Sequence, residues 1–179
     1  MYDYRFTESA LETWALIRQV WALMNRLALN RLLKTGITPE KVAVLWAARD
    51  YPGALTPAEL SRLVFRENQT TAGLLNRMEH EGLVKRLPKR KGRPYTRIEL
   101  TPKGEQICEP CVDILKNLIL TLPADIPEPE QKQICNILLK IRDSALAERY
   151  QEIVPLPDNL PKTISIIPSG HTGRGPKAL

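Results

Sequence analysis

Three threonine–proline pairs divide this chain into short helices. They are Thr38-Pro39, Thr56-Pro57 and Thr101-Pro102. A threonine oxygen at the N-cap accepts a hydrogen bond from a free backbone N–H, and proline suits the first helical position because its missing N–H would have no partner there. Thr56 also has Glu59 three residues on, the spacing of a capping box. The pairs predict helices at about 38–49 and 56–64 and a longer helix from 101.

A long amphipathic segment precedes these helices. Residues 7–34 carry two adjacent apolar rows at helical spacing. The first row is Ala10, Trp14, Ile17, Trp21, Met24, Ala28 and Leu32, and the second is Leu16, Val20, Leu23 and Leu27. Together they make a stripe too wide for a helix that covers a single neighbour. We predict a helix over 7–34, ended by Gly36, that packs against its own domain and against a second subunit.

The apolar period changes from helical to alternating at Gly82. A helix is predicted at 68–81, and residues 83–87 and 95–100 then alternate as two strands. The loop 88–94 joins them into a β-hairpin. Two more helices are predicted at about 101–121 and 128–150. The last 29 residues hold five prolines and three glycines, which is typical of an extended tail. The fold class is therefore mainly α with one small β-hairpin.

The positive charge of the chain is concentrated at this hairpin. Between Lys85 and Lys103 there are eight basic residues and a single acid, Glu99. The net charge of this segment is +7 and that of the whole chain is +6, so the other residues together carry −1. Such a cluster is the electrostatic signature of a site for a polyanion. The alternative is a solvated surface loop with no partner.

The order of elements is helix, turn, helix, basic hairpin, which predicts a winged helix-turn-helix. The second helix of such a unit can enter the major groove of DNA, and the hairpin, or wing, can follow the phosphates or enter the minor groove. The helix at 68–81 begins with small polar residues that can reach base edges or phosphates, although they could also serve only as a helix cap. The predicted DNA-binding residues are Gln69, Thr70, Thr71, Gly73, Asn76 and Arg77 on the helix and Lys89, Arg90, Lys91 and Arg93 on the wing.

The sequence resembles the MarR family of transcriptional regulators over roughly residues 10–150. Three stretches carry the resemblance: 56–60 (Thr-Pro-Ala-Glu-Leu), 76–86 (Asn-Arg-Met-Glu, then Glu-Gly-Leu-Val-Lys-Arg) and 100–104 (Leu-Thr-Pro-Lys-Gly). The resemblance implies a triangular helical homodimer, joined through its terminal helices, with two winged heads on a pseudo-palindromic operator. It also implies repression, or less often activation, of nearby genes, and release from DNA by a small aromatic or lipophilic effector.

Two departures from the family pattern affect the site. The family often has arginine where this chain has Gly73, so a base-reading side chain is missing from the middle of the recognition helix. The family's wing often has an aspartate before its arginine, whereas this wing has no acid. Arg93 is the best match for the minor-groove arginine, and Arg90 is an alternative. We therefore expect sequence readout to depend more on the wing and on DNA shape.

The domain organisation follows from these predictions. We expect a dimerisation helix at 1–36, the DNA-binding domain at 37–104, dimerisation helices at 105–150 and the tail at 151–179. The predicted function is a dimeric, site-specific DNA-binding regulator, more often a repressor. A winged-helix module that binds proteins and a nonspecific architectural DNA binder are the alternatives, and the wing charge argues against the first.

Three aromatic and charged residues are candidates for an effector pocket. Trp14 and Trp46 could line it, and Arg18, one turn from Trp14, could meet an anionic group. The alternative is that both tryptophans pack in the core and the dimer interface.

Other classes of site find little support in the sequence. Cys108 and Cys111 share a helix face, but nearby acids oppose a thiolate and too few further ligands exist for zinc. We find no catalytic motif and predict no enzyme activity, no cofactor and no metal. No secretory signal or membrane-length apolar run is present, so we predict a cytoplasmic protein.

Overall fold

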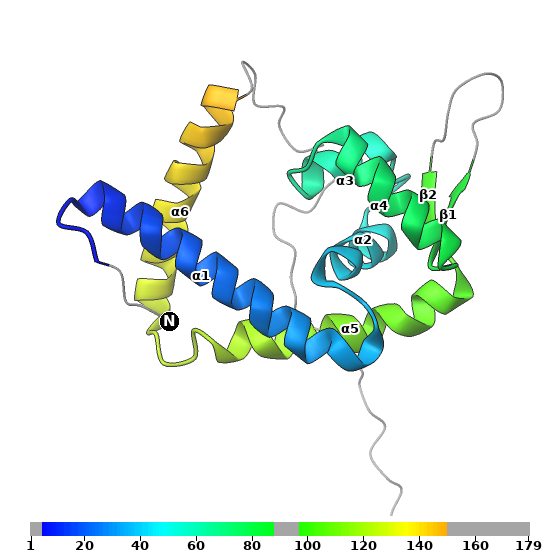
Figure 1. Cartoon of the computed structure of the whole chain (residues 1–179), viewed down its shortest axis with the longest axis horizontal. Helices are drawn as coiled ribbons and strands as arrows, with labels where there is room; N and C mark the ends of the chain where they lie inside the picture. The colour runs from blue at the N-terminus through cyan, green and yellow to red at the C-terminus, as the bar shows by residue number, and fades with distance from the viewer. Residues whose placement is uncertain (1–4, 88–96, 150–179) are drawn as a thin grey trace, which may run out of the picture.

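The computed structural model describes residues 5–87 and 97–149 and consists of a head and a helical arm (Figure 1). Its elements are α1 (Ser9–Leu32), the 3₁₀ turn η1 (Leu33–Thr35), α2 (Pro39–Asp50), α3 (Pro57–Leu63), α4 (Asn68–His80), β1 (Val84–Leu87), β2 (Arg97–Leu100), α5 (Pro102–Thr121) and α6 (Glu128–Arg149). The head is made of α2 to β2 and lies at one end of α5. The arm is made of α1 and α6, and α6 lies at the other end of α5. The prediction of a mainly helical fold with a two-stranded hairpin is confirmed.

The three threonine caps form as predicted. Thr38 Oγ1 accepts from the N–H of Lys41, and Thr101 Oγ1 accepts from the N–H of Gly104 at 3.0 Å. Thr56 and Glu59 complete a capping box, each side chain accepting from the other's backbone N–H. Local sequence therefore sets the first residue of α2, α3 and α5.

The hydrophobic core lies between α2, α4, α5 and the hairpin. α2 is the central element, since it packs on α1, α5 and β2. Its buried residues join one core cluster with buried residues of the neighbouring elements. The fully buried residues of this core include Val42 and Leu45 on α2 and Leu60, Leu75, Met78, Ile98, Cys108 and Val112 on the other elements. Burial of side chains of this size stabilises a fold by about 1.5–3 kcal/mol each.

The hairpin is short and antiparallel in its described part. Val84 pairs with Leu100 and Leu87 with Arg97. Ile98 and Val84 point into the core, while Lys85 and Arg97 are exposed. β1 begins one residue after the start of the predicted strand 83–87. Residues 88–96, which include the whole predicted wing loop and the first two residues of the predicted strand 95–100, lie outside the described part.

The end of α4, the start of β1 and the first turn of α5 meet at one close junction. Thr101 Oγ1 donates to the carbonyl of Gly82 at 2.5 Å, and the N–H of Thr101 donates to the carbonyl of Leu83 at 3.1 Å. An added Cβ at Gly104 would lie 2.0 Å from the carbonyl oxygen of Leu83. The junction therefore requires glycine at 104, because any side chain would push α5 away from the hairpin.

The two terminal helices expose apolar side chains. On α1 only Ala15, Ala28 and Leu32 are buried, while Trp14 and Trp21 are 59% and 69% exposed. On α6 the exposed apolar residues are Ile134, Ile137, Leu138, Leu139 and Ile141. One side of α1 packs on α2 and α5, as predicted, and nothing in the described part of the chain covers the other side. Within that part, no helix is long and apolar enough to cross a membrane.

Gly104→Ala should destabilise the protein by roughly 1–3 kcal/mol, because the new methyl group overlaps the Leu83 carbonyl and forces the junction apart. Urea unfolding followed by circular dichroism measures the change. The control is Gly73→Ala, whose Cβ would meet nothing nearer than Arg77 Nη1 at 3.8 Å. That variant should gain up to about 1 kcal/mol from helix propensity. Equal stability of the two variants would contradict the junction.

Candidate nucleic-acid interface

The helix α4 has one buried face and one polar face. Leu74, Leu75 and Met78 are buried against the core, as predicted. Gln69, Thr70, Asn76 and Arg77 are exposed, as a groove-facing surface requires, and Gly73 is partly exposed between them. The structure thus brings five of the six predicted helix residues to one accessible side of the head.

Thr71 is the exception, and its prediction is wrong. It is 1% exposed and lies on the same helix face as Leu74, Leu75 and Met78. Its Oγ1 is buried without a hydrogen-bond partner in the described part of the chain. The polar run 68–71 predicts that Thr71 belongs to the polar face of α4. Helical spacing instead places Thr71 three and four residues before the buried Leu74 and Leu75, and so on the core face.

Asn76 is held by a charged network at the root of the wing. Arg86, on β1, donates from Nε to Glu79 at 2.8 Å and from Nη2 to Asn76 Oδ1 at 2.6 Å, and its backbone N–H also donates to Glu79. These bonds from Arg86 hold the pKa of Glu79 below its ordinary value, although burial acts in the opposite direction. Recognition helix and wing are therefore tied together by side chains as well as by the backbone.

The orientation of the Asn76 amide follows from this contact. A guanidinium group has only donors, so the amide oxygen must face Arg86. The amide nitrogen is then left to donate elsewhere. A hollow of about 430 Å³ lies here, lined by Asn76, Glu79, His80 and Arg86.

Sequence reasoning missed Arg86, Glu79 and His80 as parts of this surface. His80 lies four residues after Asn76 and is exposed, so helical spacing alone could have placed it there. The Arg86 contacts could not be found this way, because they depend on how β1 packs beside α4.

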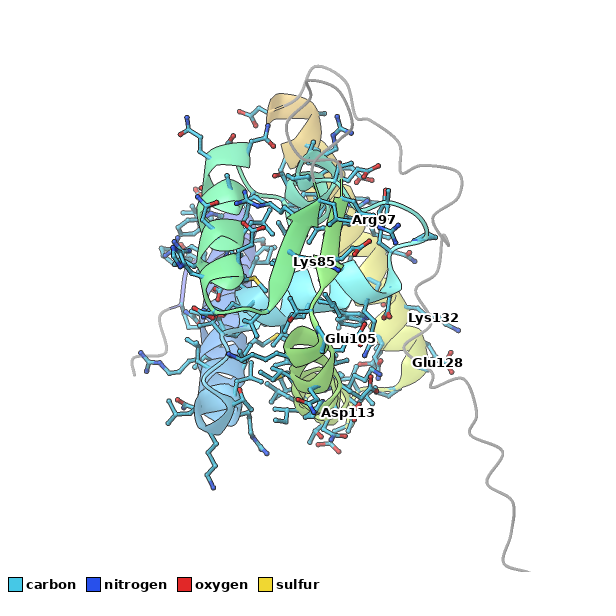
Figure 2. All side chains as sticks on the ribbon, turned by 90° about the vertical axis from the view of Figure 1, so that its right-hand side faces the viewer. Lys85, Arg97, Glu105, Asp113, Glu128 and Lys132 are labelled. Atoms are coloured by element: carbon cyan, nitrogen blue, oxygen red, sulfur yellow. The ribbon has the colours of Figure 1, made fainter. Side chains whose placement is uncertain are left out.

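The described cations at the base of the hairpin each meet an acceptor. Lys85 and Arg97 both contact Glu99, at 3.1 and 3.2 Å. Arg86 is bound by Glu79, and Lys103 donates to the carbonyl oxygen of Glu81 at 2.8 Å. Figure 2 shows Lys85 and Arg97 on the two strands of the hairpin and the acids Glu105 and Asp113 further along α5. The predicted wing residues Lys89, Arg90, Lys91 and Arg93 lie outside the described residues.

The three candidate effector residues lie in different surroundings. The guanidinium carbon of Arg18 lies 5.1 Å from the centre of the exposed Trp14 ring, a cation–π contact. Trp46 is partly buried against the core cluster. Burial would raise the pKa of Asp50, but hydrogen bonds from Arg49 and Trp46 more than offset it and lower that pKa. Trp14 and Arg18 therefore lie together on α1, whereas Trp46 fits the alternative of a core residue.

The two helix cysteines are buried thiols. Cys108 and Cys111 are both enclosed in the core, and burial raises the pKa of Cys108 to about 11. The group stays protonated at neutral pH, which makes it a poor nucleophile. Within the described residues no group of three or more His, Cys, Asp or Glu could hold a metal ion.

Glu79→Gln should destabilise the protein by about 1 kcal/mol at neutral pH, since a partly exposed charge pair with Arg86 contributes roughly that much. The lowered pKa of Glu79 means that this stability is present above the ordinary value of 4.5 and is lost as pH falls through the folded-state value. Unfolding measured from pH 7 downward tests this: the gap between wild type and variant should narrow as the pH falls below 4.5. The control, Glu148→Gln at an exposed position of α6, should show no such gap.

This chain has relatives among known proteins. No family model matches the chain. Over 115 residues it is 31% identical to the multiple antibiotic resistance protein MarR of Salmonella typhimurium, and the match covers 62% of this chain and 79% of that protein.

Solved structures share the fold over most of this chain. The ligand-free organohalide-sensing transcriptional regulator RdhR superposes with a TM-score of 0.75 at 22% identity, covering 88% of this chain and 95% of its own. S. aureus MepR in complex with DNA gives 0.70 at 23%, covering 77% and 99%. A mutant E. coli MarR with operator DNA gives 0.67 at 24%, also covering 77% and 99%. With its 31% identity to the Salmonella regulator, the chain belongs to the MarR family of winged-helix DNA-binding transcription regulators.

Proposed function

We propose that this protein is a homodimeric regulator that binds a specific, pseudo-palindromic DNA site and acts in the cytoplasm as a repressor. The observation that carries the proposal is the polar face of α4 beside a wing whose segment carries +7. Two of the structures that share the fold are complexes with DNA, one of them with operator DNA. The proposal includes no enzyme activity and no cofactor, since its relatives are transcription regulators.

The DNA-contacting surface has two parts. Gln69, Thr70, Gly73, Asn76 and Arg77 would face the major groove, because they lie opposite the buried residues of α4. Lys89, Arg90, Lys91 and Arg93 would supply the wing contacts, and this second part rests on the sequence alone. The described cations at the base of the wing contribute less to DNA binding, because Lys85 and Arg97 share Glu99 and Arg86 is bound by Glu79.

The dimer interface would be formed by α1 and α6. Both carry several large apolar side chains that one chain leaves exposed. Groups of exposed apolar residues are typical of interaction sites. The helices belong to the segments 1–36 and 105–150, which we assign to dimerisation, with 37–104 as the DNA-binding domain. A two-fold dimer presents its recognition helices to half-sites about 34 Å apart.

A small aromatic or lipophilic effector would act on the arm of the molecule. Trp14 with Arg18 offers an aromatic face and a cation on α1, a combination that suits an anionic aromatic compound. Among the structures that share the fold is RdhR bound to 2,4-dichlorophenol. Trp46 would be affected by such a ligand only indirectly, through a change in core packing, because its side chain packs against the core.

Selection of bound sequences from random DNA should enrich a pseudo-palindrome whose affinity falls steeply with salt.

Arg93→Ala should weaken binding and lower the salt slope by about one phosphate's contribution, roughly 0.9. Arg31→Ala, on α1 outside the head, is the control and should leave both unchanged. Salt-dependent binding without enrichment would indicate an architectural role, and absence of binding would favour a protein-interaction module.

Ile137→Glu should convert the dimer to monomers, because a charge would then be buried in the apolar interface of α6. Analytical ultracentrifugation over a range of protein concentrations measures this, with at least a tenfold rise in the dissociation constant expected. Asn136→Glu adds the same charge to the neighbouring, more polar side of α6 and serves as the control. If both variants stay dimeric, the interface lies elsewhere.

A further inference from the structure

Gly73 leaves a space on the polar face of α4, and Arg77 lies beside it. A Cβ built on Gly73 would meet one atom of the structure within 4 Å, Arg77 Nη1, at 3.8 Å. The two residues are four apart, so they are neighbours on one side of the helix. Helical side chains lean toward the N-terminus, which carries the Arg77 guanidinium back over the turn that contains Gly73. The long side chain thereby reaches the middle of the recognition helix.

The surrounding acids do not hold Arg77. Glu79 is engaged by Arg86, and Glu81 accepts from Lys41 through both oxygens at 2.7 Å. Among the described residues none forms an ion pair or hydrogen bond with the Arg77 guanidinium. Four cations near this helix, Lys85, Arg86, Arg97 and Lys103, each meet an acceptor instead. Arg77 is therefore an exposed cation left for an external partner.

From this geometry we propose that Arg77 reads one guanine in each half-site, from the space that Gly73 leaves open. The inference rests on the proposed DNA-binding function and names the residue that gives it sequence specificity. An arginine fork donates to O6 and N7 of guanine in the major groove, and such a pair discriminates against other bases by about 1–3 kcal/mol. Gly73 acts as the positioning residue, because a large side chain there would displace the guanidinium.

The test compares sequence selection by the full-length wild type, Arg77→Ala and Gly73→Leu, with Arg31→Ala as the matched control. Arg77→Ala should lose preference for one guanine per half-site, lowering discrimination there by about fivefold or more, while other positions keep theirs. Gly73→Leu should have the same effect. Circular dichroism checks that each variant is folded.

A modified base gives an independent measurement. Replacing the selected guanine by 7-deazaguanine removes the N7 acceptor, so it should weaken binding by wild type but not by Arg77→Ala. If Arg77→Ala weakens binding equally for all sequences and lowers the salt slope, Arg77 contacts a phosphate and the inference is overturned. If wild type itself enriches no sequence, the proposed function fails and the inference fails with it. An enriched site that Arg77→Ala still reads in full overturns the inference alone.

Discussion

The contact between the first turn of α5 and the start of the hairpin holds the rest of the structure in place. Gly104 lets the helix approach the Leu83 carbonyl, and Thr101 bonds to the carbonyls of Gly82 and Leu83 while also capping α5. One threonine thus joins the end of the recognition helix, the wing and the long helix α5 that leads to α6. The head cannot tilt on α5 without breaking these bonds, so the position of α4 depends on the path of α5 (Figure 1).

The acids of the head decide which of its cations stay available. Glu99 lies between Lys85 and Arg97, Glu79 holds Arg86, and Glu81 holds Lys41. The Arg86–Glu79 pair joins the hairpin to α4, whereas the Glu99 pairs lie within the hairpin and Lys41–Glu81 joins α2 to the end of α4. They are partly exposed, so each contributes little to stability alone. Their larger effect is on geometry, because they orient Asn76 and keep carboxylates away from Arg77.

Much of the fold could be predicted because its signals are local. The threonine–proline pairs set helix starts, and Gly82 marks the change from helix to strand, which is enough to name a winged helix. The site was predicted less well. Thr71 lies within a polar run, and its burial follows only from the orientation of α4 against the core. The bond from Arg86 to Asn76 depends on strand packing beside the helix. The sequence predicts Arg77 as a DNA-binding residue, but its position over Gly73 depends on the conformation of the arginine side chain.

The arrangement of α1 bears on how a signal on the arm would reach DNA. Trp14 and Arg18 lie toward the start of α1, whereas the buried Ala28 and Leu32 near its end join the helix to the head. α1 packs on α5 and α2, and α5 in turn carries the Thr101–Gly104 junction. A ligand that favours one position of α1 relative to α5 would therefore shift both recognition helices of a dimer, because each head is fixed to its own α5. The spacing of the two heads, more than the fold of either, is then what an effector would control.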